Sequence, residues 1–318
     1  MDIIGLILWP IKWVIEAILV GFHSMLTAAG MEEAAGLTWV LSITGLVLVI
    51  RAALIPVFVR QIKSQRRMME IAPQLKKIQD KYKGKRDQFS REAMSRETMA
   101  LYKNTGTNPL SSCLPLLLQM PIFFGLFSVL NDAYGSRDSV GLLTEQLQTQ
   151  FGSADLFGVA PLGSSMATSD GNVAVIVIAV ILVILMTSSQ FITQLQIMSK
   201  NQSPEMKASP MYRQQRVLLY VLPLVFAFSG FAFPLGVMFY WFVSNIWTMV
   251  QQFIVIRNMP TPGSEAALAR EARLDKRRQR KGLPTIVEDA PPEAVEELKK
   301  TQRTQPVGKN RAKKKGGK

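Results

Sequence analysis

The sequence predicts an all-α, polytopic membrane protein: a five-span helical bundle with a cytoplasmic helical hairpin and a polar groove open to cytoplasm and lipid. Three observations predict this fold. Of 318 residues, 48% are hydrophobic, yet the formal net charge is +14. Long apolar runs alternate with strongly basic segments, as in membrane proteins with basic soluble parts. One apolar run also contains an arginine, Arg51.

Five apolar segments are long enough to cross a bilayer within a bundle. The first, 37–59, has 23 residues, about 34 Å as a helix, which spans with some tilt. The others are 109–132 (apolar from Ser112), 173–198, 217–233 and 235–256. The last two are separated only by Pro234, which predicts a tight helical hairpin. These two are short, and a bundle accommodates short spans by thinning the bilayer locally.

The distribution of Lys and Arg predicts the orientation. Segments 60–108, 199–216 and 257–318 hold 13, 4 and 17 basic residues, whereas 133–172 and 1–36 hold one each. Because basic loops stay in the cytoplasm, we expect the N-terminus outside and the C-terminus in the cytoplasm. Segment 133–172 is then extracytoplasmic, and its sequence predicts no particular structure.

The N-terminal segment 1–36 is expected to be an extracytoplasmic interfacial amphipathic helix. Lys12 and Glu16 share one face of this helix, Trp9 and Trp13 share another, and Pro10 interrupts the apolar run. This pattern is typical of a helix lying at the interface. The alternative is a sixth span, which would put both termini in the cytoplasm.

The cytoplasmic segment 60–108 predicts a charged helical hairpin broken at Gly84, with a second helix from about Asp87 to Lys103. It is long for a connector, since connections in bundles usually have about 2–8 residues. The segment 257–318 is a basic cytoplasmic tail. It predicts a helix from Ser264 to about Lys281, and its final ten residues hold six basic side chains and no acid. Ribosomal RNA and anionic lipid are equally good targets for this tail.

Composition excludes several classes of protein. With one cysteine, Cys113, and one histidine, His23, neither an intrachain disulfide nor a zinc site of the Cys/His type is expected. The sequence has no phosphate loop, no GxSxG elbow and no HExxH. We therefore expect no cofactor, no metal and no enzymatic activity.

Arg51 is the strongest candidate for function. A cation in the centre of a membrane helix costs about 2.5–3.5 kcal/mol on insertion scales and is by default a functional residue. None of the five predicted spans has an acidic residue in its body; Asp132 lies only at an outer end. The counter-charge is therefore water, a lipid headgroup or a visiting molecule.

Other polar side chains are concentrated in the predicted cytoplasmic halves of the same spans. Thr44 lies seven residues before Arg51 and thus on the same helix face. The remaining candidates for the lining of a cytoplasm-facing groove are Gln119, Gln190, Gln194, Tyr240, Trp241 and Asn245. Polar surface at membrane depth is tolerated where it lines a water-filled cavity. Serines and threonines of these spans, Ser244 among them, are more often interhelical glue worth about 0.6 kcal/mol each.

The chain closely resembles the YidC membrane insertases, in the short form that lacks the large extracytoplasmic domain. The resemblance covers about 37–256. It is carried by four stretches: IRAALIPVFVRQIKSQRRM, APQLKKIQDKYKGKRD, ETMALYKNTGTNPLSSCLPLLLQMPIFFGLFSVL and FPLGVMFYWFVSNIWTMVQQFIV. The most specific parts are Asn108–Phe123 and Tyr240–Gln252.

The resemblance implies an insertase in the bacterial plasma membrane that moves translocated segments of small membrane proteins, alone or with the Sec translocon. It implies that Arg51 is the groove arginine, that Trp241 lies beside the groove, and that 60–108 is a mobile hairpin needed for activity. Nascent membrane-protein clients, the Sec translocon, the ribosome and anionic lipids are the expected partners, and the sequence is compatible with a monomer. Two alternatives are a chaperone that holds helices without translocating them and an anion-binding transporter.

Overall fold

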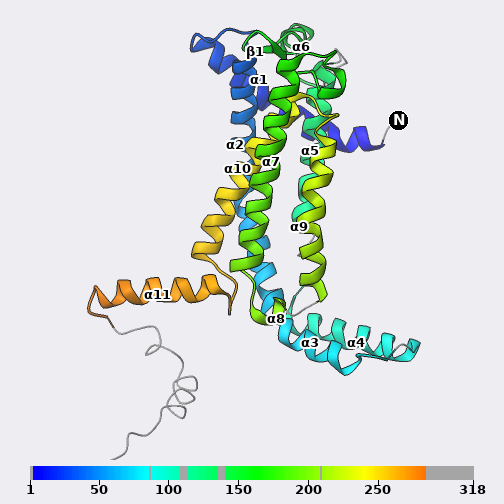
Figure 1. Ribbon diagram of the computed structural model, residues 1–318, viewed down its shortest axis with the longest axis vertical. Helices are drawn as coiled ribbons and strands as arrows, with labels where there is room; N and C mark the ends of the chain where they lie inside the picture. Colours follow the sequence, from blue (N-terminus) through cyan, green and yellow to red (C-terminus); the bar gives the residue numbers. More distant parts are fainter. Residues whose placement is uncertain (1–2, 86, 108–113, 135–139, 208–209, 284–318) are drawn as a thin grey trace, which may run out of the picture. The chain divides into compact units, whose positions relative to one another are not determined.

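The computed structural model describes residues 3–85, 87–107, 114–134, 140–207 and 210–283. The chain divides into two compact units, Met1–Ala266 and Ala267–Lys318, and each is described by itself. Most of the first unit is helical (Figure 1).

Five long helices correspond to the five predicted spans. They are α2 (Gly36–Glu70), α5 (Leu114–Tyr134), α7 (Val173–Lys200), α9 (Pro210–Ser229) and α10 (Leu235–Asn258). The core of the bundle is made where α10 packs on α7 and α2, while α9 packs on the other side of α7. α9 ends at Ser229 and Pro234 is the N-cap of α10, so the break between these two helices covers 230–234.

Three helices in the described part of the chain are long and apolar enough to cross a membrane. They are Leu8–Ala28, Gly36–Met68 and Val173–Lys200. The second and third contain two of the predicted spans. The first lies in α1 (Ile3–Ala28), for which the sequence analysis favoured an interfacial position with a span as the alternative.

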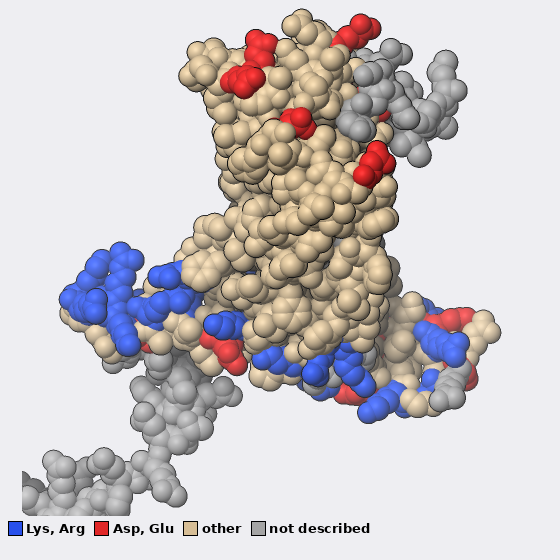
Figure 2. All heavy atoms as spheres, turned by 45° about the horizontal axis from the view of Figure 1, so that its top comes forward, with Lys and Arg blue, Asp and Glu red and all other residues tan. Residues whose placement is uncertain are grey.

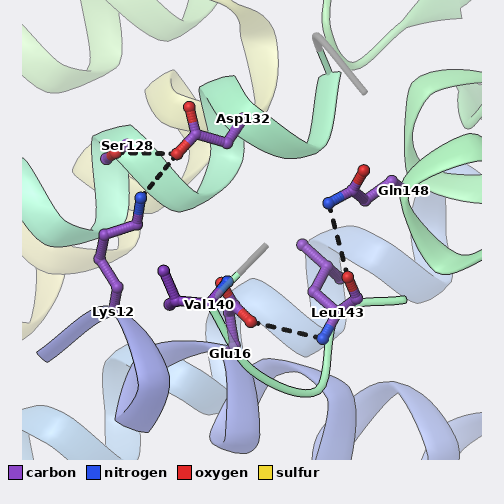
Figure 3. Close-up of polar contacts among 7 residues, drawn as sticks. All are labelled: Lys12, Glu16, Ser128, Asp132, Val140, Leu143 and Gln148. Carbon is purple, nitrogen blue, oxygen red and sulfur yellow. Dashed lines mark hydrogen bonds and ion pairs between the residues drawn. The ribbon is translucent and has the colours of Figure 1, made fainter. Parts of the chain in front are cut away.

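Helix α1 packs against α2 and α5 and runs obliquely across the upper end of the bundle in Figure 1. Ile15 and Leu19 are buried in the core. Lys12 and Glu16 also face inward, as Figure 3 shows. Lys12 Nζ lies 2.7 Å from Asp132 Oδ2 of α5, and Glu16, only 2% exposed, accepts hydrogen bonds from the amides of Val140 and Leu143.

Residues 140–172 fold over the same end of the bundle into α6 (Glu145–Gly152), an antiparallel pair β1 (Asp155–Leu156) and β2 (Ala160–Pro161), and the 3-10 helix η2 (Met166–Thr168). A Cβ on Gly36 would lie 2.6 Å from the backbone of Asp155, so this approach of α2 to β1 requires glycine. Trp39 is fully buried here between His23 and Phe151.

At the opposite end, α2 continues without a break to Glu70, eleven residues beyond the predicted end of its span. Pro73, in the first turn of α3 (Ala72–Lys81), starts a new helix. Helix α4 (Gln88–Thr105) follows, and Asp87 caps it by accepting a hydrogen bond from the Ser90 amide. α3 packs on α4 and on the short α8 (Pro204–Lys207). The predicted hairpin is therefore shorter than its segment, because the first eleven residues extend α2.

Charges separate along the first unit (Figure 2). One end carries Glu32, Glu33, Glu145, Asp155 and Asp170, and we name it the acidic end. The other end carries the Lys and Arg side chains of 60–85, 87–107, 200–207 and 210–216, and we name it the basic end. This separation follows the alternation of basic segments in the sequence.

In the second unit, α11 (Glu265–Gln279) begins directly after Ser264, as predicted. Its last turn is basic, with Lys276, Arg277 and Arg278. The remainder of the predicted tail, 284–318, lies outside the described residues.

Candidate functional site

Arg51 lies in the middle of α2, fifteen residues after Gly36, about 22 Å along the helix. The residues on both sides, SITGLVLVI before it and AALIPVFV after it, are apolar or small. The side chain is half-buried. The local sequence therefore holds a guanidinium at membrane depth on an otherwise apolar helix.

The partners of Arg51 are neutral. Its Nη2 donates a hydrogen bond to the Ser244 hydroxyl of α10, and its Cζ lies 5.9 Å from the centre of the Phe58 ring. Among the described residues, no carboxylate lies within ion-pair distance of Arg51. A guanidinium has five N–H donors, so one bond to Ser244 leaves most of its hydrogen-bonding capacity for another acceptor.

Arg51 lines a pocket between α2, α5 and α10. The lining consists of three polar side chains and four aliphatic ones: Arg51, Gln119, Tyr240, Val47, Ile50, Leu54 and Ile122. The pocket leaves about 10 Å³ for the centre of a water molecule, about the minimum that holds one water.

A chain of polar contacts closes this pocket. Gln119 Nε2 of α5 donates to the Tyr240 hydroxyl over 3.3 Å, which is long for such a bond. Tyr240 interacts in turn with the side chain of Ser244, one helical turn away. Because Ser244 also accepts from Arg51, the contacts join α5, α10 and α2.

Helix α5 packs closely against some of its neighbouring helices and only loosely against the others. In the described residues α5 contacts α1 and α6 extensively, but it makes few contacts with α2 and α10. The pocket thus has two tightly packed walls, α2 and α10, and one loosely packed wall.

The structure brings together three of the predicted groove residues, Arg51, Gln119 and Tyr240. The other five lie outside the set that lines this pocket in the described residues. Thr44 donates to the Val40 carbonyl of its own helix, and Asn245 donates to the Met186 carbonyl of α7. Gln190 and Gln194 are half-buried on α7.

Trp241 packs in an aromatic cluster rather than in the pocket. Its ring lies 5.4 Å from that of Phe123 and 5.7 Å from that of Phe233. Ser244, expected from the sequence to be interhelical glue, does join α10 to α2, but its partner Arg51 was not predicted. The available signal was the spacing of four residues between Tyr240 and Ser244, which puts both side chains on one face of α10.

Comparison with known proteins identifies the family. Residues 30–262 match the family model described as 60Kd inner membrane protein. Two relatives named "Membrane protein insertase YidC" cover nearly the whole chain. The one from Tropheryma whipplei (strain Twist) is 44% identical over 98% of this chain and 97% of its own length. The one from Bifidobacterium longum is 36% identical over 96% and 95%. The chain belongs to the YidC membrane insertase family.

A third YidC relative, from Streptomyces avermitilis, is 44% identical over 84% of this chain and 61% of its own length. Membership in the YidC family, together with the long apolar helices, makes the chain a membrane-inserted protein of the bacterial plasma membrane. The relatives are named insertases, which is a role without covalent chemistry. The match spans α2 to α10, so it contains all the residues that form the Arg51 pocket.

Proposed function

We propose that this chain is an insertase that draws short hydrophilic segments of small membrane proteins toward Arg51 and releases their apolar helices into lipid. The observation that carries this proposal is a half-buried guanidinium at membrane depth whose hydrogen-bond partner is the neutral Ser244. A structural cation at this depth would be expected to have a carboxylate partner. Here the missing anion is supplied by the client.

The energetic argument has two parts. An acidic side chain 4 Å from Arg51 gains about 4 kcal/mol at an effective dielectric constant of 20, compared with about 1 kcal/mol in water. The apolar helix of the client then gains about 0.3–0.6 kcal/mol for each Leu, Ile, Phe or Val that enters lipid. Attraction to Arg51 therefore recruits the polar segment, and hydrophobic partitioning drives release without a nucleotide.

The loosely packed wall of the pocket gives an entry route. Displacing α5 breaks the 3.3 Å Gln119–Tyr240 bond and the ring contact of Phe123 with Trp241, whereas most contacts of α5 are with α1 and α6. We propose that the client enters between α5 and the α2–α10 pair, and that Ser244 holds the guanidinium in place until a carboxylate replaces it.

The test is insertion of a purified single-span client into liposomes that contain this protein. Two clients are compared, one with two aspartates in its translocated segment and one with asparagines at the same positions. Arg51→Ala is expected to lower insertion of the acidic client at least about tenfold, equivalent to about 1.4 kcal/mol. Insertion of the asparagine client should change much less, and Arg51→Lys should retain most activity toward both.

Equal activity of Arg51→Ala on both clients would reject the electrostatic role. A wild-type protein that binds the client but never exposes its segment to a protease inside the liposome would favour the holding chaperone instead. Anion flux through empty proteoliposomes would favour the transporter.

We further propose that the basic end faces the cytoplasm, because basic segments remain on that side, and that the acidic end faces outward. Nascent clients, the Sec translocon and the ribosome are then the partners, with α11 and the basic tail on the ribosomal side. Deleting 284–318 and comparing co-sedimentation with ribosomes and with anionic liposomes at two salt concentrations separates ribosomal RNA from lipid as the target.

A further inference from the structure

The turn between β1 and β2 presents an apolar tip to the surface. Phe157 is 85% exposed and Val159 is 52% exposed. Phe157 and Gly158 have positive φ values of 57° and 72°, and the Val159 amide donates to the Leu156 carbonyl to close the turn. A left-handed conformation is a genuine outlier for a bulky residue. The chain thus holds a large aromatic side chain outward at a backbone position that favours glycine.

The tip is tied to the beginning of α7. The Asn172 side-chain amide donates to the Val159 carbonyl over 2.8 Å. The oxygen of the same side chain caps α7 by accepting from the amides of Ala174 and Val175. One residue therefore sets the tip at the level of the first turn of α7.

The first turn of α7 is also where the apolar surface of that helix begins. From Val173 to Met186 the sequence has fourteen consecutive apolar residues. Several of them are exposed, including Val173 at 70%, Val177 at 49% and Ile181 at 50%. In a membrane protein an exposed apolar stripe on a spanning helix faces lipid. The edge of the hydrocarbon layer is thus expected near Val173.

We propose that the Phe157–Val159 turn is a lipid anchor, inserted at the edge of the hydrocarbon layer at the acidic end of the protein. The Asn172–Val159 hydrogen bond places the turn next to the first turn of α7, where the exposed apolar stripe of that helix begins. The nearby charges are acidic, Asp155 and Asp170, which fits contact with acyl chains rather than attraction to anionic headgroups. The Asn172 bonds make the anchor rigid relative to α7.

A nitroxide spin label measures the depth of the turn directly. In a Cys113→Ser background, Phe157→Cys is labelled and the full chain is reconstituted in liposomes. Collision with oxygen, which concentrates in hydrocarbon, is compared with collision with a polar nickel chelate, which stays in water. We expect the oxygen-to-nickel ratio to be at least about threefold higher at position 157 than at Glu145→Cys, an exposed position on α6 at the same end.

A label at Val159→Cys gives a second reading if the change at position 157 disturbs the turn. Combining it with Phe157→Gly, which suits the positive φ and deletes only the side chain, tests the role of the aromatic ring. We expect the Val159 label to become more accessible to nickel in this variant. An unchanged Val159 label would show that Asn172 alone sets the depth, and the anchor would be rejected.

Two other outcomes also overturn the proposal. High nickel access at 157, equal to that at 145, would place the tip in water. Low access to both reagents would mean that protein covers the tip, such as a second copy of this chain.

Discussion

Two sets of charged side chains lie inside the bundle, and they differ in whether the chain itself supplies a partner of opposite charge or a full set of hydrogen bonds. Near the acidic end, Lys12 is paired with Asp132, and Glu16 accepts two backbone hydrogen bonds (Figure 3). In the middle of the bundle, Arg51 has Ser244 and the face of Phe58. The first set is satisfied within the chain, whereas the second contains a cation that has no carboxylate partner among the described residues.

This difference indicates that the first set of charges has a structural role, whereas Arg51 is available to bind another molecule. The carboxylates of Glu16 and Asp132 fix α1 and the 140–143 loop onto α5, because each lies on a different segment from its partner. Ser128 donates a further hydrogen bond to Asp132, which completes that site. In the part of the chain that the structure describes, no carboxylate pairs with Arg51, so the stabilisation that an anion would bring is still available there.

The difference between the two sites should disappear if the chain itself supplies a carboxylate partner for Arg51. Ser244→Asp places a carboxylate where the hydroxyl now accepts the Arg51 hydrogen bond. We expect insertion of a client with an acidic translocated segment to fall at least about tenfold, since the client must now displace a charge-assisted pair. The measurement is the liposome insertion assay.

Ser244→Asn is the matched control, because it has the size of aspartate and no charge. It should retain most of the activity toward the same client. Equal loss in both variants would indicate that bulk at position 244, rather than charge, blocks the pocket.

Removing one charge from each site should change the stability of the protein differently. Asp132→Asn leaves Lys12 without its anion; buried pairs broken in this way lose about 3–5 kcal/mol. With side chains 14% and 17% exposed, we expect about 1–3 kcal/mol, because solvent screens part of the effect. Arg51→Met should leave stability unchanged or raise it, because it removes a desolvated cation. Thermal unfolding of both variants in detergent checks this.

The double variant Lys12→Met/Asp132→Leu is the control for the ion pair. It should recover most of the stability lost in Asp132→Asn, since neither charge is left alone. A large destabilisation by Arg51→Met would mean that Arg51 is a structural residue.

Local sequence signals predicted many of the helix ends. Pro234 and Gly84 separate helices where expected, and Ser264 immediately precedes α11. The end of α2 was not predicted. Charged residues after Val59 indicated a new element, but Lys, Arg and Gln are good helix formers, so α2 continues until the turn before Pro73.

Contacts between distant segments could not be predicted from such signals. Glu16 reads as the polar face of an interfacial helix, yet it is buried because the 140–143 loop folds over it. The importance of Arg51 was visible in the sequence, since a charge in an apolar run is rare. Its partner was not, because several hydroxyl and amide side chains lie on α10 and only packing selects Ser244.

The α3–α4 hairpin contains an exposed ion pair between Lys81 and Glu97. We expect pH to change the stability of this hairpin only slightly, which is the smallest effect predicted. Lys81 and Tyr82 donate hydrogen bonds to Glu97. The bond from Lys81, and then that from Tyr82, lowers the pKa of Glu97, and the same contact raises the pKa of Lys81. Above the ordinary glutamate pKa of about 4.3 the Glu97 contribution is complete. It is lost as the pH falls through the lowered pKa of the folded protein.

The Lys81 contribution is complete below about pH 10.4, the ordinary lysine pKa, and is lost as the pH rises through the raised value. Amide hydrogen exchange of 72–105, corrected for the intrinsic effect of pH, should therefore show constant protection near neutrality and a small decrease in acid. Glu97→Gln should reduce protection slightly at neutral pH and flatten the acid response. Asp87 titrates in the same direction through its bond from Ser90, so any residual acid response in Glu97→Gln should disappear when Asp87→Asn is added. A response that survives both changes would mean that neither carboxylate holds the hairpin together.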